Sequence, residues 1–286
     1  MGSFSRLSIS VFIGGLIASH ALASGCVYKI TGPQGGTLYL GGSWHLLRRV
    51  DYPLPAAYNR AFDAASRLSF EIAPNDMESM SKGLAHAGEY PRGDNLKSHV
   101  DPRTYDYLKR FFALTNLPEE KFSRYRPWFL AMSLRDGNNN EFLGRLGIES
   151  FFGRRAQANG KKVTGLESAR EHMEVFSGLS DRAGEALLLI SLMPADKSSP
   201  DFSRMINAWR QGDIDFLANA VYAAYRDFPA MANRLVADRN RKWIPELEQY
   251  LRSGQTYFVI VGAAHLGRSE GVISLLKARG YQVQQI

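Results

Sequence analysis

The sequence has a single cysteine, Cys26, among its 286 residues. One thiol excludes a disulfide within the chain, so the fold must be held together by its apolar core. Hydrophobic residues make up 45% of the chain and charged residues 22%, a balance typical of globular proteins and not of disordered ones. At this length, that apolar content is ample for one large core or two small ones.

The chain also lacks the sequence signatures of several enzyme and binding classes. It has no serine nucleophile elbow, no phosphate-binding loop, no dinucleotide-binding glycine pattern and no His-Glu-x-x-His zinc helix. The net charge is +7, but lysine and arginine are scattered singly or in short pairs and form no basic stripe interleaved with aromatic residues. We therefore expect no nucleic-acid partner, and we interpret the positive charge as a source of solubility and mild attraction to anionic surfaces.

Long apolar runs are missing after the first two dozen residues. Arg6 supplies a short positive region, residues 7–17 are apolar, and Ala21-Leu22-Ala23 is a small-x-small cleavage site. This pattern predicts a signal peptide at residues 1–23 and a mature chain that is exported to the periplasm or cell envelope. The run is too short for a spanning helix, although an N-terminal anchor that is never cleaved is an alternative.

Cys26 leaves two interpretations of the mature N-terminus. Ser24-Gly25-Cys26 matches the last three positions of a bacterial lipoprotein box, with Ala23 where leucine is usual. A lipid on Cys26 would be the only membrane contact that we expect of the mature chain. The alternative is cleavage after Ala23, which leaves an unpaired thiol three residues into the mature protein.

The apolar patterning places strands near both ends of the chain and mainly helices between them. Strands are expected at residues 27–30, 37–40, 68–72, 162–167, 256–261 and 281–283. We therefore predict an α/β fold with a mixed sheet built from the N- and C-terminal segments. Residues 24–286 would form a single domain, with a large helical insertion at about 76–250. Within it, the amphipathic helical region at residues 214–250 would break at Phe228-Pro229.

An apolar strand that runs into Gly-x-x-His occurs twice. Residues 37–41 precede Gly42-Ser43-Trp44-His45, and residues 257–261 precede Gly262-Ala263-Ala264-His265. Each glycine lets the backbone turn sharply and lets a ligand approach closely. Because ligands collect at the carboxyl ends of strands in an open α/β sheet, we expect His45 and His265 on neighbouring strand ends. Two imidazoles there predict a site for a divalent transition metal, although a lone histidine is more often structural.

Acidic side chains stand at or beside other expected element ends. Glu71, at the end of a strand, would ligate the metal or act as a general base, unless it is simply solvated. Glu167 occupies a similar position, although an acid beside Ser168 also suits a helix N-terminus. Glu149 precedes an expected helix, and we give it less weight.

Two further residues are candidates for the surroundings of the site. Arg239 lies in a long expected helix, where it would pair with Glu71 or Glu167 or bind a substrate carboxylate; the alternative is a solvated face. Trp44 would line a pocket or pack in the core. The remaining histidines that we considered lack a neighbouring glycine and are expected to be structural or on the surface: His86, His99 and His172.

In their order and separation, several blocks of this chain resemble the TraB/PrgY/GumN family, which includes the Tiki metalloproteases. The blocks that carry the resemblance are residues 38–45, 52–55, 68–71, 127–128, 147–149, 165–167, 239–240 and 261–266. The resemblance implies a fold similar to the erythromycin-esterase/ChaN-like group. It also implies that His45, His265 and Glu71 are both the catalytic residues and the ligands of a divalent metal such as manganese, cobalt or zinc.

The same resemblance places Glu167 and Arg239 around this centre, with Glu149 and Trp44 nearby. Trp44 stands where the family usually has a small or β-branched residue, which would narrow the site. Glu149 stands where aspartate is common, which moves a carboxylate by one methylene. Either departure would alter the metal or the substrate without removing the site.

The resulting hypothesis is an exported, metal-dependent hydrolase that acts on peptide bonds in a peptide or protein substrate. An alternative is a periplasmic binding protein that captures a peptide, a metal or haem without turnover. A third is a structural accessory of an export or envelope system, which would require a partner and no metal.

Overall fold

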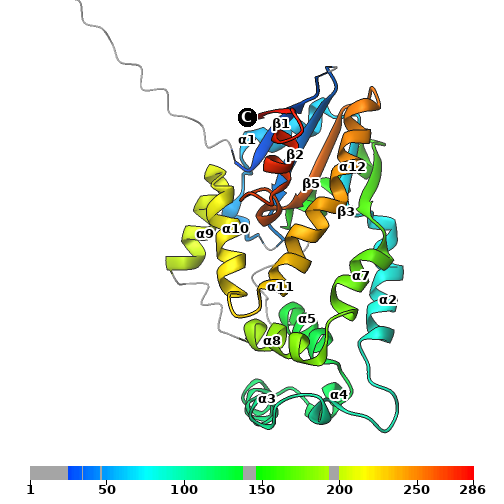
Figure 1. Cartoon of the computed structure of the whole chain (residues 1–286), viewed down its shortest axis with the longest axis vertical. Coiled ribbons are helices and arrows are strands. Elements are labelled where there is room, and N and C mark those ends of the chain that lie inside the picture. Colours follow the sequence, from blue (N-terminus) through cyan, green and yellow to red (C-terminus); the bar gives the residue numbers. More distant parts are fainter. Residues whose placement is uncertain (1–24, 34, 46, 138–145, 193–199) are drawn as a thin grey trace, which may run out of the picture.

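A computed structural model describes residues 25–33, 35–45, 47–137, 146–192 and 200–286. Its centre is a six-stranded mixed sheet with the strand order β4-β3-β5-β2-β1-β6 (Figure 1). The strands are β1 (Val27–Thr31), β2 (Thr37–Ser43), β3 (Arg67–Ile72), β4 (Lys162–Glu167), β5 (Tyr257–Gly262) and β6 (Gln282–Gln285). Segments from both ends of the chain thus share one sheet, which confirms the predicted α/β fold.

The pairing of the strands explains how the two ends of the chain meet. β1 and β2 form the expected antiparallel hairpin, and β6 adds to the other side of β1. β5 lies between β2 and β3 and runs parallel to both, and β4 runs parallel to β3. Residues 257–261 of β5 are all buried, as expected for a parallel strand that is covered on both faces.

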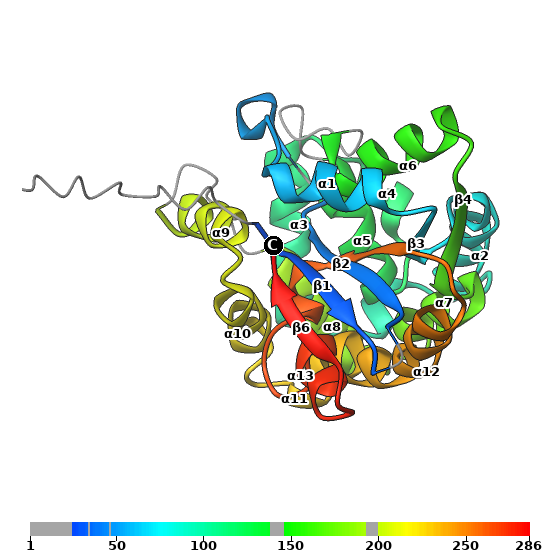
Figure 2. The ribbon, with the colours of Figure 1, turned by 90° about the horizontal axis from the view of Figure 1, so that it is seen from above.

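Helices cover both faces of the sheet (Figure 2). On one face lie α1 (Ala56–Ala64) and α6 (Ile148–Ala158), and on the other lie α12 (Asp238–Arg252) and α13 (Val272–Lys277). Aromatic contacts join these layers: Phe152 of α6 packs edge-on against Phe258 of β5, with ring centroids 5.5 Å apart. Tyr250 of α12 stacks on Tyr257 at the start of β5.

The remaining helices form most of the middle of the chain, below the sheet and at its sides in Figure 1. They are α2 (Met77–Ala87), α3 (Pro102–Thr115), α4 (Glu119–Phe122), α5 (Pro127–Gly137), α7 (Ala169–Ser177), α8 (Asp181–Leu192), α9 (Pro200–Gln211), α10 (Ile214–Ala224) and α11 (Pro229–Ala232). Several of these helices share an apolar cluster separate from that of the sheet, with members such as Leu84, Leu108, Leu130 and Leu188. The predicted helical middle region is therefore confirmed.

α2 lies at the start of the predicted helical region, which begins at about residue 76. Of this helix only Met80 and Leu84, one turn apart, are buried. The helix follows β3 through the short turn Pro74–Asp76 and packs against α7, which follows β4. The pair thus begins beyond the carboxyl ends of two neighbouring parallel strands.

The end of β2 is packed too tightly for any residue larger than glycine at position 42. A Cβ atom on Gly42 would lie 2.8 Å from the Cβ of Cys26 and 3.0 Å from Ala263. The Gly42 carbonyl accepts hydrogen bonds from the Tyr58 hydroxyl (2.5 Å) and from Trp209 Nε1 (2.9 Å). Because Gly42 has no side chain, β1, β2 and the segment after β5 can approach one another closely. The two hydrogen bonds to its carbonyl fix the end of β2, which precedes His45.

Cys26 belongs to the core of this region. Its side chain is fully buried, and Sγ lies 3.2 Å from the carbonyl oxygen of Trp209. This placement favours the interpretation in which the thiol is unmodified. The predicted signal peptide, residues 1–23, lies outside the described residues, so export and the domain boundary at residue 24 stay predictions. No helix in the described part of the chain has both the length and the apolar character needed to cross a bilayer.

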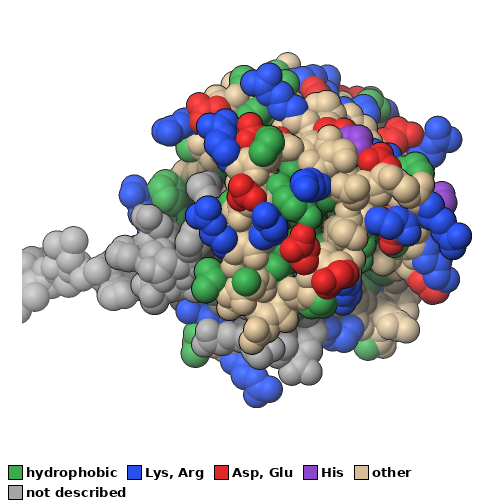
Figure 3. Space-filling view, turned by 90° about the horizontal axis from the view of Figure 1, so that it is seen from below, with side chains coloured by type: hydrophobic (Ala, Val, Ile, Leu, Met, Phe, Trp, Pro, Cys, Tyr) green, Lys and Arg blue, Asp and Glu red, His purple; other side chains and the backbone are tan. Residues whose placement is uncertain are grey.

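Charges of both signs are mixed on the surface. On the face shown in Figure 3, lysine and arginine side chains alternate with aspartate and glutamate, with no continuous basic patch on that face. The expectation that the chain has no nucleic-acid partner stays a prediction.

Candidate functional site

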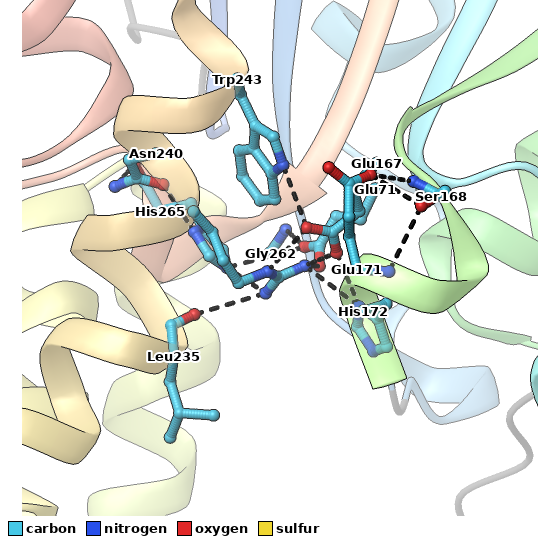
Figure 4. A network of polar contacts seen from close by, with 11 residues as sticks. Glu71, Glu167, Ser168, Glu171, His172, Leu235, Asn240, Trp243, Gly262 and His265 are labelled. Atoms are coloured by element: carbon cyan, nitrogen blue, oxygen red, sulfur yellow. Dashed lines mark hydrogen bonds and ion pairs between the residues drawn. The ribbon is translucent and has the colours of Figure 1, made fainter. Parts of the chain in front are cut away.

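The two Gly-x-x-His segments follow neighbouring strand ends. In the parallel pairing of β2 and β5, Ser43 lies opposite Gly262, so His45 and His265 both emerge from the same edge of the sheet. Glu71 lies near the end of β3, the other neighbour of β5, and Glu167 ends β4. Four adjacent strands therefore deliver the predicted histidines and two of the predicted acids to one edge. Figure 4 shows His265, Glu71 and Glu167 there.

His265 is buried and held in one orientation by Asn240. Its Nδ1 lies 2.7 Å from Asn240 Oδ1, while Asn240 Nδ2 donates to the backbone carbonyls of His265 and Glu270. Because the amide nitrogen is used by these carbonyls, Oδ1 must accept, and Nδ1 of His265 carries the hydrogen. Nε2 is then the atom with the free electron pair.

The charge state of His265 follows from its surroundings. Burial lowers the pKa of His265 to about 4; Glu71 opposes this shift, and Arg239 adds to it. The ring also packs against Trp243, with centroids 4.6 Å apart. At neutral pH the imidazole is therefore uncharged, with Nε2 as an acceptor.

Glu71 is held from two sides. Its Oε1 accepts a hydrogen bond of 2.7 Å from the backbone N–H of Gly262, and its Oε2 accepts one of 2.5 Å from Arg239 Nη2. Burial alone would raise the pKa of Glu71, but the Arg239 guanidinium, the nearby histidines and the Gly262 N–H together outweigh burial and hold that pKa well below the usual range. Glu71 is therefore ionised at neutral pH.

Glu167 shares the same guanidinium. Its Oε1 accepts from Arg239 Nη2 at 2.5 Å, and its Oε2 accepts from Arg239 Nε at 3.1 Å and from Trp243 Nε1 at 3.2 Å. Burial would raise the pKa of Glu167, whereas His172 and Arg239 lower it. The side chain does not cap a helix: Ser168 and Glu171 form the capping box of α7 instead.

Arg239 lies at the centre of the cluster and not on a solvated helix face. Only 7% of the residue is exposed, and its guanidinium lies over the Trp243 ring, 4.7 Å from the centroid. Its Nη1 donates to Nε2 of His265 at 3.2 Å. The pairing with Glu71 and Glu167 that the sequence suggested is present, and one arginine makes both contacts at once.

His45 faces a different partner. Its Nδ1 lies 2.8 Å from Oε1 of Glu149, in the first turn of α6, and 70% of the His45 side chain is exposed. Burial would raise the pKa of Glu149, but His45 lowers it. His45 is near enough to the buried cluster that its charge also contributes to lowering the pKa of Glu71 and of His265.

Trp44 joins β2 to α6. It is half-buried and packs against the core of the sheet, and its carbonyl accepts a hydrogen bond from Ile148 N at the start of α6. The core placement that the sequence analysis offered as an alternative describes this residue.

The sequence analysis missed His172. Its Nδ1 lies 2.7 Å from Glu167 Oε1 and 3.4 Å from Arg239 Nη2, and its side chain is only 16% exposed. A signal was present: the capping box Ser168–Glu171 starts α7 directly after β4, so a residue five positions after Glu167 turns back toward the strand end. By contrast, His99 is bonded to Asp94 and Asp181, within the loop after α2 and the start of α8, and it fits the structural role expected of it.

The donor groups of the cluster fit a divalent ion. Ligand atoms of Glu71, Glu167 and His172 lie within 4.8 Å of one another, and Glu71 Oε1 lies 3.8 Å from His265 Nε2. Carboxylate oxygens and neutral imidazole nitrogens are ligands for zinc and related divalent metals. An amide that fixes the other nitrogen of the ring, as Asn240 does for His265, is the outer hydrogen bond that a metal-ligating histidine commonly has.

Comparison with known proteins places the chain in one family. The TraB/PrgY/gumN family model matches residues 26–285, a stretch that includes both Gly-x-x-His segments and every residue of the buried cluster. No curated protein and no solved structure matches the chain. The match covers nearly the whole sequence, as the resemblance of the separate blocks predicted. The chain therefore belongs to the TraB/PrgY/gumN family.

Proposed function

We propose that this chain is an exported, divalent-metal-dependent hydrolase that cleaves peptide bonds. The observation that carries the proposal is that Nε2 of a neutral, buried His265 and Oε1 of an ionised Glu71, two acceptor atoms, lie 3.8 Å apart at the carboxyl edge of the sheet. A neutral imidazole and a carboxylate are the protonation states that metal binding requires.

His265, Glu71 and His45 would hold the ion. A divalent ion bound there would supply Lewis-acid chemistry, polarising a carbonyl and activating water for attack. Because its pKa is held so low, Glu71 is a poor proton acceptor, and this favours its role as a ligand over that of a general base. Glu149 holds Nδ1 of His45, so Nε2 is the atom through which His45 would bind a metal or move a proton.

In the structure described here, Glu167 and Arg239 hold these groups in place. Arg239 bridges the two carboxylates, and Glu167 in turn is held by Trp243 and His172. The choice of a peptide substrate is supported by the resemblance to the Tiki metalloproteases, and the proposed location in the periplasm or cell envelope is supported by the leader pattern at residues 1–23.

The metal can be tested directly. Residues 24–286 purified without chelator, and then loaded with manganese, cobalt or zinc, are compared by elemental analysis with the double variant His45→Ala/His265→Ala. We expect near-stoichiometric metal in the wild type and little in the double variant. His86→Ala, which removes an exposed histidine of α2, is the control and should bind as the wild type does. Equal metal content in the wild type and the double variant, or none in a folded wild type, would refute the metal site.

Turnover is tested separately with a peptide library on the loaded protein. Cleavage that is lost in the double variant supports the hydrolase. Stoichiometric metal without cleavage would instead favour a binding protein. In that case a Soret band on titration with hemin, absent from His265→Ala, would identify haem as the ligand.

A further inference from the structure

The positive charge of Arg239 occupies the position that a metal would take among the buried acids. Its guanidinium contacts Glu71 and Glu167 at 2.5 Å each, His265 at 3.2 Å and His172 at 3.4 Å. These four residues include all three members of the possible metal-binding group, together with the buried histidine of the second Gly-x-x-His segment. Arg239 therefore donates to both buried carboxylates and to Nε2 of His265, and it lies beside Nδ1 of His172, which itself faces Glu167.

The charges of the cluster also indicate that Arg239 takes the place of a metal ion. Two buried carboxylates require a nearby cation, and Arg239, 7% exposed, supplies it. A divalent ion added to a cluster that already holds the guanidinium would bring three positive charges against two negative ones. The same oxygens cannot serve both cations at full strength, so the metal and Arg239 compete for them.

We propose that Arg239 is a built-in competitor of the metal: a divalent ion binds Glu71 and His265 by displacing the guanidinium from them. The inference rests on the proposed metal-dependent function and adds to it a residue that sets the metal affinity. In the structure, Arg239 holds the carboxylates and His265 in place; in the metal-bound protein, its side chain lies away from Nε2 of His265 and from Oε2 of Glu71.

The helix that carries Arg239 has a feature suited to this movement. A π-helical turn, Asn233–Ala237, ends two residues before Arg239, and Arg239 Nη1 also contacts the carbonyl of Leu235 within that turn. A π-turn holds one more residue than the α-helix around it and is frequent at functional sites. If the extra residue of the π-turn is taken up elsewhere, the helix that follows it shifts by one residue, and Arg239 moves with it. The carbonyl of Leu235 is an acceptor for the guanidinium outside the acid cluster.

Zinc affinity tests the proposal. Wild type, Arg239→Met and Arg241→Met are titrated with zinc by calorimetry, and thermal midpoints without zinc report whether each protein is folded. We expect Arg239→Met to bind zinc at least about tenfold more tightly than the wild type, because the competitor is gone. Arg241 lies on the same helix but is exposed and paired with Asp238, so Arg241→Met should bind as the wild type does.

A second variant covers the case in which Arg239→Met does not fold. Arg239→Lys keeps the charge, but its single nitrogen on a shorter side chain cannot reach all the positions that Nε, Nη1 and Nη2 of the guanidinium occupy, so its zinc affinity should exceed that of the wild type. The wild type also gives a direct signal: zinc should shift the fluorescence of Trp243, which lies under the guanidinium, and Trp243→Phe should lose that shift.

The outcomes separate this inference from the proposed function. Tighter zinc binding in the Arg239 variants supports the inference. Equal or weaker binding in these variants, with a wild type that does bind zinc, overturns the inference and leaves the metal-dependent function standing. No zinc binding by any of the proteins overturns both.

Discussion

His265 and Asn240 fix each other at the end of β5. The imidazole Nδ1 lies 2.7 Å from the amide Oδ1, and the amide nitrogen donates to the carbonyls of His265 and Glu270. One fully buried asparagine thus determines the tautomer of the histidine and holds the loop that carries it. The precision of the site therefore comes from α12, which supplies Arg239, Asn240 and Trp243, as much as from the strands.

The first prediction concerns Asn240. Asn240→Ala removes these three hydrogen bonds at a position with no access to water, so it should lower the free energy of unfolding by about 1–3 kcal/mol. It should also weaken zinc binding by about tenfold or more, because the tautomer of His265 is no longer fixed. Urea denaturation and zinc titration measure the two effects.

Asn159→Ala is the control for this prediction. Asn159 is exposed at the end of α6, and its loss should change the free energy of unfolding by less than about 0.5 kcal/mol. If Asn240→Ala is as stable as this control and binds zinc as the wild type does, Asn240 has no such role.

The second prediction concerns pH. The pKa of His265 is about 4 in the folded, metal-free protein, against about 6.5 in an unfolded chain, so only the unfolded state takes up the proton between these values. The free energy of unfolding should therefore fall as pH is lowered from about 6.5 to 4, by up to about 3 kcal/mol, with the full contribution of His265 present above pH 6.5.

Urea denaturation at several pH values, in the presence of chelator, measures this slope. His265→Gln should lose most of it, since glutamine does not titrate. His86→Gln should keep it, because His86 is exposed. An unchanged slope in His265→Gln would mean that His265 is not the group that is kept neutral by burial.

The sequence predicted the frame of the site well because strands carry a simple signal. Short segments rich in apolar and β-branched residues, bounded by glycine or proline, identified β2, β3, β4 and β5, and the parallel pairing of these four strands brings their carboxyl ends to one edge. Gly42 and Gly262 lie at the ends of two of these strands, β2 and β5. The positions of His45, His265, Glu71 and Glu167 along one edge follow from this alone.

The contacts within the site could not be predicted in the same way. The pairing of Arg239 with Glu71 or Glu167 was one of the alternatives predicted, but the contact of Asn240 with His265 was not. Asn240 lies on the buried face of α12, and a pattern based on apolar residues assigns such a polar residue to solvent. The partner of His45 is Glu149, which is 104 positions away and is brought there by the packing of α6 on the sheet. His172 was missed because we looked for glycine beside each histidine and not for the helix start that turns it toward Glu167.

The third prediction concerns Glu149 and His45. The pKa of Glu149 is lowered by His45 against the effect of burial, so His45→Ala should raise that pKa, leaving burial as the larger influence. Carbon-detected NMR titration of the Glu149 carboxyl group measures the change. His86→Ala should leave the titration as it is in the wild type, and an unshifted Glu149 in His45→Ala would show that the two side chains are not paired in solution.

The fourth prediction concerns Cys26. Its thiol is fully buried against the carbonyl of Trp209, and burial raises its pKa well above the usual range. The thiol should therefore resist a disulfide reagent such as DTNB in the native protein and react with one equivalent after denaturation. Cys26→Met should lower the free energy of unfolding by about 1–3 kcal/mol, since the extra atoms would have to enter a packed core. Cys26→Ser keeps both the size of the side chain and the hydrogen bond to the Trp209 carbonyl, so it should be less destabilising than Cys26→Met.

The same burial bears on how the mature N-terminus is processed. A lipid on Cys26 would have to leave the core through the packed contact between β1 and α9, and the fold as it stands provides no room for it beside Gly42. We therefore expect cleavage after Ala23 and an unmodified thiol. The intact mass of the mature protein should equal that of residues 24–286, with no added lipid. A mass equal to that of residues 26–286 plus a diacylglycerol group would show instead that Cys26 is lipidated. Its side chain would then lie outside the core in the mature protein.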